Sequence, residues 1–416
     1  MRPLPSLLVA LLFVAATVIP VAGIHPATER TETVTGPVQS VTAVDNTTNQ
    51  LTVPADAVRR SNYNETGIDI STSAEAWSAQ LHHRHDSLAF EAQFRQTESN
   101  LKRSQLIDTR LATIEAKHRA LDRRQDTAVS RYARGEISPK EFLRTRLVIH
   151  AEATELLETL DRVAAVPDAA PDYTPADSLT TRLRTTEGEL KTLTGPIGSR
   201  LQSGVAASDS GPIYLEASDS GYTLATVAGD QYVRETRLDD ARNGTLPDEF
   251  LSTAVNDGNP GTDRLDIAGE RAANLYPWLY ERQRPSFTFY GTSGIYELTA
   301  NHPNGELTAY LDGGTTDIFY EQQFRDLSNV RTRGTEQNVT DSLRVTVQRS
   351  SDTGPLLVSA ANNETGAVVD GRVLIDGRSV GTTGSDGLLW TVEPRGSYTV
   401  TVATDSSRTN VTVRDI

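Results

Sequence analysis

The sequence predicts a multidomain α+β protein. We expect an N-terminal helical hairpin or three-helix bundle, a middle, mainly antiparallel α+β domain and a small C-terminal β-sandwich. Two observations predict this order. Apolar residues recur at three-, four- and seven-residue steps as far as residue 203, which is typical of amphipathic helices. From residue 212 onward they alternate with polar residues between Gly-, Asp- and Ser-rich turns, which is typical of strands.

Residues 1–23 have the pattern of a signal peptide. Arg2 precedes an almost wholly apolar run over residues 4–22, and Val21, Ala22 and Gly23 are the small residues that signal peptidase needs. We therefore expect export and an extracellular or cell-surface location. The alternative is an uncleaved anchor, because this run approaches the ~20 residues that span a bilayer. In that case the protein would be a membrane-tethered sensor or assembly factor.

The composition is acidic, with a net charge of −15, and only four of the 40 basic residues are lysines. Carboxylates in excess keep a protein soluble in concentrated salt, where their mutual repulsion is screened. This favours a haloarchaeal source and excludes a nucleic-acid partner, since no basic stripe is present to bind phosphates. The chain has no cysteine, which excludes disulfides, thiolate metal ligands and cysteine nucleophiles.

Residues 24–71 are rich in Thr, Asn and Val, and we expect a mostly extended stalk with a few short strands. Asn-x-Thr sequons occur here and later in the chain, and each is a candidate glycosylation site. Their asparagines are Asn46, Asn64, Asn243, Asn338, Asn363 and Asn410.

Residues 72–203 are predicted to form the helical hairpin or bundle. Gly135 ends one helix, and Ser138, Pro139 and Glu141 have the order of a capping box that begins the next. A third apolar stripe, which starts at Leu179, completes a bundle. Four leucines of the second stripe are candidates for a contact with another envelope protein or a second copy of the chain. They are Leu143, Leu147, Leu157 and Leu160.

Residues 212–350 are predicted to form the middle domain, with a helix over residues 265–281 among its strands.

Residues 355–416 contain the runs Thr383-Gly384-Ser385-Asp386-Gly387 and Pro394-Arg395-Gly396-Ser397-Tyr398-Thr399-Val400. This segment resembles the carboxypeptidase-regulatory-like β-sandwich family. The resemblance implies a seven-strand spacer or interaction module without catalytic activity. The whole layout also resembles exported haloarchaeal cell-surface proteins of unknown function, which implies no activity.

Two clusters are candidate metal sites, although no cofactor is expected beyond a weakly indicated calcium ion. His82, His85 and Asp86 would share one face of a helix and could hold zinc or nickel. A solvated helix face is the alternative. Asp257, Asn259 and Asp263 supply oxygen ligands at alternate positions, as calcium requires, but their spacing departs from that of an EF-hand. A turn that leads into a helix at Asp263 is the alternative.

These observations predict a non-enzymatic, extracytoplasmic cell-surface protein that mediates protein–protein or envelope interactions in high salt. We assign no catalytic residue, because no Gly-x-Ser-x-Gly, His-Glu-x-x-His or phosphate-binding loop is present. A secreted hydrolase with residues 212–350 as its catalytic domain is the alternative.

Overall fold

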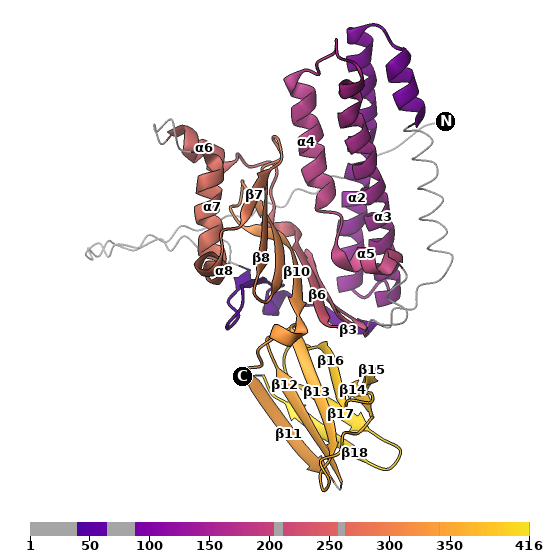
Figure 1. Cartoon of the computed structure of the whole chain (residues 1–416), viewed down its shortest axis with the longest axis vertical. Coiled ribbons are helices and arrows are strands. Elements are labelled where there is room, and N and C mark those ends of the chain that lie inside the picture. Colours follow the sequence, from indigo (N-terminus) through magenta and orange to yellow (C-terminus); the bar gives the residue numbers. More distant parts are fainter. Residues whose placement is uncertain (1–39, 65–87, 204–210, 257–262, 341, 416) are drawn as a thin grey trace, which may run out of the picture. The chain divides into compact units, whose positions relative to one another are not determined.

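The helical region is a bundle of three long helices and a short one. The computed structural model describes residues 40–64, 88–203, 211–256, 263–340 and 342–415. In it α2 (Asn100–Ala133), α3 (Pro139–Ala165) and α4 (Asp177–Lys191) lie side by side (Figure 1). The 3-10 turn η2 (Val166–Ala169) joins α3 to α4, and α5 (Pro196–Ser203) follows. Residues 88–96 form a further helical stretch.

Capping residues set the ends of these helices. Ser99 accepts the backbone N–H of Lys102 at the start of α2, and Gly135 follows its end with a φ of 76°. Ser138 accepts the N–H of Glu141 at 3.1 Å to begin α3, as the sequence predicts. Leucines and isoleucines at helical spacing fill the space between the helices, and this packing makes the hairpin stable.

The middle of the chain forms an eight-stranded, wholly antiparallel sheet in the order β3-β4-β5-β6-β10-β9-β8-β7. Its strands are β3 (Arg60–Asn64), β4 (Ile213–Ser218), β5 (Gly221–Ala228), β6 (Gln231–Leu238), β7 (Ser286–Phe289), β8 (Ile295–His302), β9 (Gly305–Asp312) and β10 (Ile318–Asp326). A two-stranded sheet, β1 (Val41–Thr42) with β2 (Gln50–Leu51), precedes β3. The 3-10 turns η1 (Ala55–Ala57), η4 (Asp239–Ala241) and η5 (Leu327–Asn329) complete the region.

Both faces of the eight-stranded sheet are covered. On one face Leu215 and Tyr222 pack against Phe142 of the helical bundle. On the other face side chains of β8 and β9 pack against residues 51–53 and three short helices. These helices are α6 (Glu249–Asn256), α7 (Arg264–Leu275) and α8 (Pro277–Arg282). Because side chains alternate along a strand, the central strands of the sheet contribute to separate cores on its two faces.

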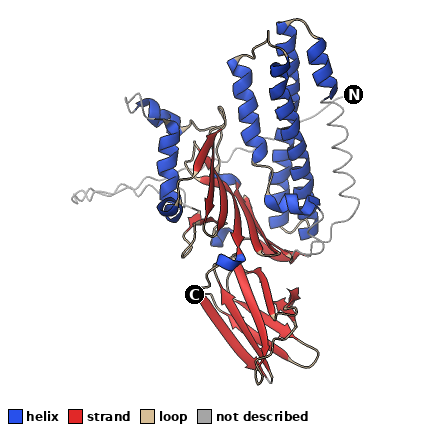
Figure 2. Ribbon diagram, in the orientation of Figure 1, coloured by secondary structure: helices blue, strands red, loops and turns tan. Residues whose placement is uncertain are grey.

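The C-terminal region is a β-sandwich of two four-stranded sheets (Figure 2). One sheet has the order β11-β12-β13-β16 and the other β15-β14-β17-β18. The strands are β11 (Gly334–Thr340), β12 (Leu343–Arg349), β13 (Pro355–Asn362), β14 (Arg372–Ile375), β15 (Arg378–Thr382), β16 (Leu388–Val392), β17 (Tyr398–Ala403) and β18 (Arg408–Val413). Alternate residues of both sheets, mostly valines, form its core. The resemblance implied seven strands, and the structure has eight.

Two expected boundaries differ from the structure. Residues 40–64 are not a stalk, because β3 pairs with β4, and Leu51 and Val53 are fully buried. The partner strand lies about 150 residues away, so composition alone does not reveal the pairing. The sandwich begins at β11 rather than at residue 355, because β11 pairs with β12 and β12 pairs with β13 instead of joining the preceding sheet.

Candidate functional site

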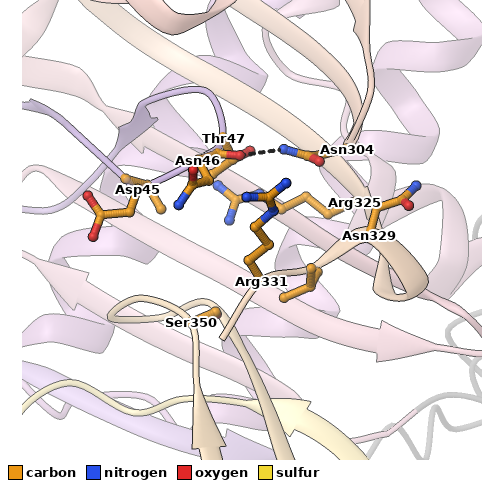
Figure 3. Close-up of a pocket in the computed structure, with 10 residues that line it drawn as sticks. Asp45, Asn46, Thr47, Asn304, Arg325, Asn329, Arg331 and Ser350 are labelled. Carbon is orange, nitrogen blue, oxygen red and sulfur yellow. Dashed lines mark hydrogen bonds between the residues drawn. The ribbon is translucent and has the colours of Figure 1, made fainter. Parts of the chain in front are cut away.

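The candidate site is a small pocket where four separate parts of the chain meet (Figure 3). The loop between β1 and β2 contributes residues 44–47, and the β8–β9 hairpin contributes Asn304. Arg325 near the end of β10, residues 329–331 and Ser350 complete the lining. One hydrogen bond closes the pocket on one side, from Asn304 Nδ2 to the carbonyl oxygen of Asn46 at 2.9 Å.

Arg325 is the most unusual group in this pocket, because it is a buried arginine whose guanidinium donates only to neutral acceptors. Its side chain is 3% exposed. Nε donates to Gln323 Oε1 at 3.0 Å, and Nη2 donates to the same oxygen at 2.8 Å and to Gln50 Oε1 at 3.1 Å. Nη1 has no hydrogen-bond partner among the residues that the structure describes, and no described carboxylate lies within 4.0 Å of the guanidinium.

The one carboxylate beside Arg325 on this face of the sheet is already engaged. Glu321 Oε1 accepts from Arg234 Nη1 at 3.3 Å and from Gln323 Nε2 at 2.9 Å. Its Oε2 accepts from Tyr276 Oη at 2.6 Å and from the N–H of Leu51 at 2.9 Å. Of the two buried arginines on this face, only Arg234 contacts this carboxylate, and burial lowers the pKa of Arg325.

A buried hydroxyl is the second unpartnered group of the pocket. Thr47 is 7% exposed, and its Oγ1 has no hydrogen-bond partner among the described residues. The exposed Arg331 lines the same pocket. A guanidinium whose bonds are all to neutral oxygens and a buried hydroxyl without a partner are donors suited to an anion.

The opposite face of the sheet also buries arginines, but there each meets a carboxylate. Arg146 Nη2 lies 3.4 Å from Glu235 Oε1, and Glu235 Oε2 accepts the N–H of Ile197 at 3.3 Å. Arg237 contacts Asp239 at 2.6 Å and Asp122 at 3.2 Å. Burial raises the pKa of Glu235, while Arg146 lowers it. These pairs join the helices to the sheet.

A second hollow lies between α4, the start of α7 and β7, and it contains one predicted site residue. Asp263 is the N-cap of α7, where its carboxylate accepts the N–H of Leu265 at 3.2 Å. Asp263 therefore begins a helix, as in the alternative to a role as a calcium ligand. Asp257 and Asn259, like His82, His85 and Asp86, lie outside the described residues. Within the described ranges, no group of three His, Cys, Asp or Glu side chains could hold a metal ion.

The predicted interface leucines are part of the chain's own core. Leu143 and Leu147 are buried beneath the sheet, and Leu160 is buried in the bundle. Leu157 is partly buried against the same bundle core. The structure thus corrects their assignment as a free interface, because apolar positions at helical spacing here meet the neighbouring helices and the sheet.

The sequon asparagines lie mostly at the surface. Five of them are exposed, and Asn64 is half-buried. The exposed five are Asn46, Asn243, Asn338, Asn363 and Asn410. Their glycosylation stays a prediction.

Sequence reasoning missed the pocket around Arg325. A signal was present, because Glu321, Gln323 and Arg325 alternate along a strand that also carries apolar residues. Such a polar face on a central strand indicates buried polar chemistry rather than solvent.

Comparisons with known families agree with the division into three regions. Residues 1–210 match the model described as Domain of unknown function (DUF7096), and residues 213–331 match Family of unknown function (DUF7094). Residues 334–411 match the Archaeal fibronectin-III type-like domain. This match supports a C-terminal β-sandwich, and it is to a different β-sandwich family from the one that the sequence resembles. No curated protein and no solved structure matches the chain.

The matches contain no catalytic family. None of the described helices is both long and apolar enough to span a bilayer, and residues 4–22 lie outside that search. The model for residues 1–210 covers just over half of the 416 residues, and the chain therefore belongs to the family described as Domain of unknown function (DUF7096).

Proposed function

We propose that this protein is a non-enzymatic, exported component of the cell envelope that binds other envelope proteins in high salt. One observation carries the proposal: the fibronectin-III-like sandwich is fastened to the eight-stranded sheet by buried polar contacts. A module held in this way extends a rigid binding surface, which suits an adaptor.

The contact between the sandwich and the sheet includes a bidentate ion pair. Arg395 donates to both oxygens of the fully buried Glu216, at 2.8 and 3.2 Å. Tyr63 Oη donates to the carbonyl oxygen of Val392 at 2.6 Å, and Tyr232 Oη donates to that of Thr353. Paired hydrogen bonds between a guanidinium and a carboxylate fix orientation as well as distance.

The helical bundle is the proposed contact region, through its exposed side chains rather than its buried leucines. Lys102 and Lys117 of α2 and Lys140 of α3 are exposed, so amine-reactive cross-linkers reach this surface. Exposed Leu101, at 70%, adds an apolar group at the start of α2.

Cross-linking mass spectrometry on intact cells in their growth salt tests the proposal. We expect links from these three lysines to a second envelope protein. A variant with all three changed to arginine keeps the charge and should lose the links. Links confined to the chain itself would contradict an adaptor role.

The mass of the native N-terminus tests export separately. A chain that starts at Ile24 has lost its leader, as we expect. A chain that retains residues 4–22 would favour the tethered alternative.

A further inference from the structure

We propose that the pocket around Arg325 and Thr47 is a binding site for a single halide ion, chloride in saline surroundings. This proposal does not depend on the proposed function.

The first argument is charge. Arg234 and Arg325 are both buried on the face of the sheet that carries Glu321, and only Arg234 contacts that carboxylate. Moving an unpaired charge out of water is costly, and amide oxygens such as those of Gln323 and Gln50 offset only part of the cost. An anion within reach of Nη1 would balance the second guanidinium. A water molecule could accept the same hydrogen bond but would leave the charge uncompensated.

The second argument is the donor set. Arg325 and Thr47 line one pocket. The Thr47 hydroxyl is buried without a partner, and Arg325 Nη1 makes none of the hydrogen bonds seen among the described residues. Both can donate to an anion, whereas the guanidinium cannot accept from any ligand. The amide of Asn304, also at the pocket, already donates to Asn46.

The third argument is size. The pocket leaves about 20 Å³ open to the centre of a water-sized particle. That space suits one small occupant, since about 10–15 Å³ is needed for a single water. A monatomic anion has the size of such an occupant.

An ion bound here would fasten the N-terminal segment to the rest of the chain. Thr47 lies in the loop between β1 and β2, and Gln50 of β2 accepts from Arg325. Gln50 Nε2 also donates to the carbonyl oxygen of Asp352, in the sandwich. Halide binding should therefore stabilise the folded chain, because a ligand that binds only the folded state shifts the unfolding equilibrium.

The test compares thermal unfolding of the purified full-length chain in sodium chloride and sodium sulfate at equal sodium concentration. General salt effects favour sulfate, which is excluded from protein surfaces. A halide site adds a chloride-specific rise in the unfolding midpoint, which should approach saturation as chloride increases. Arg325→Gln should remove that rise, and Arg325→Lys should retain part of it. Arg408→Gln, at an exposed position outside the pocket, is the matched control and should keep it.

Line broadening of the chloride-35 NMR signal by the unmodified chain gives a second readout, which does not require a folded variant. We expect broadening that bromide reverses by competition. A chloride-minus-sulfate difference that is identical in the unmodified chain and Arg325→Gln would overturn the proposal. So would an unbroadened chloride signal.

Discussion

The two faces of the eight-stranded sheet bury similar side chains but balance their charges differently. Toward the helical bundle, Arg146 meets Glu235, and Arg237 meets two aspartates. On the opposite face, Arg234 lies 3.3 Å from Glu321, whereas Arg325 donates only to amide oxygens. Arg146 and Arg237 therefore each have a carboxylate partner, whereas Arg325 has none among the described residues.

This difference distinguishes buried polar groups that stabilise the fold from buried polar groups that are available to bind a ligand. A balanced buried pair fixes how the layers dock, and removing either partner exposes the full desolvation cost of the other. A buried cation without a partner charge is costly, and an anion from outside the described residues would lower that cost. The pocket at Arg325 is therefore where we place a ligand, and the Arg146 cluster is where we place none.

The largest expected effect on stability comes from removing one partner of the buried Arg146–Glu235 pair. Arg146→Met should lower the free energy of unfolding by about 3–5 kcal/mol, because it leaves the buried Glu235 carboxylate unpaired. Chemical denaturation measures the loss. The double variant Arg146→Met/Glu235→Met is the control and should recover most of it. A loss below about 1 kcal/mol in the single variant would contradict a buried, charged pair.

The next effect concerns the joint between the sheet and the sandwich. Arg395→Met should cost about 1.5–3 kcal/mol, the range for hydrogen bonds to a charged group. We also expect calorimetry to show two transitions, because the sandwich would then unfold separately. Arg408→Met, at an exposed sandwich position, should leave a single transition. One unchanged transition in both variants would show that the ion pair does not couple the two regions.

The pH dependence on the bundle face should come partly from His150. Burial, and then the charge of Arg146, lowers the pKa of His150 from 6.5 to about 4. Between these values the unfolded chain binds a proton that the folded chain does not. The free energy of unfolding should therefore fall as pH falls from 6.5 toward 4, by at most about 1.4 kcal/mol per pH unit for this residue.

His150→Asn should flatten that slope by about one proton, since Asn retains an acceptor for the N–H of Gly195. Denaturation at a series of pH values measures the slope. An identical slope with and without the imidazole would show that His150 titrates normally in the folded chain.

The smallest effect should come from Arg331, which lines the pocket but is exposed. Arg331→Gln should change the free energy of unfolding by no more than about 0.5 kcal/mol, as most surface substitutions do. A larger loss would mean that Arg331, rather than Arg325, holds the pocket together.

Local patterns predicted the elements well, because their causes are local. The capping residues Ser138 and Gly135 and the helical leucine stripes specify the hairpin from neighbouring positions alone. The pairing of β3 with β4 depends on packing between distant segments, so the sequence of residues 40–64 looked like a stalk. The sandwich was recognised from its turns, but its first two strands carry no comparable signal.

The candidate site was harder to predict than the fold. Arg325 becomes notable only when its burial and its neighbours are known, because an arginine at a strand end is ordinary in a sequence with 36 arginines among its 40 basic residues. The predicted interface leucines failed for a related reason. Helical periodicity shows that a face is apolar, and it does not show whether a partner or the same chain covers it.

Anomalous diffraction from crystals grown with bromide in place of chloride tests the charge difference between the two faces most directly. We predict an anomalous peak within hydrogen-bonding distance of Arg325 Nη1, and none beside Arg146. A pocket filled by water without anomalous signal, or bromide beside both arginines, would contradict the account.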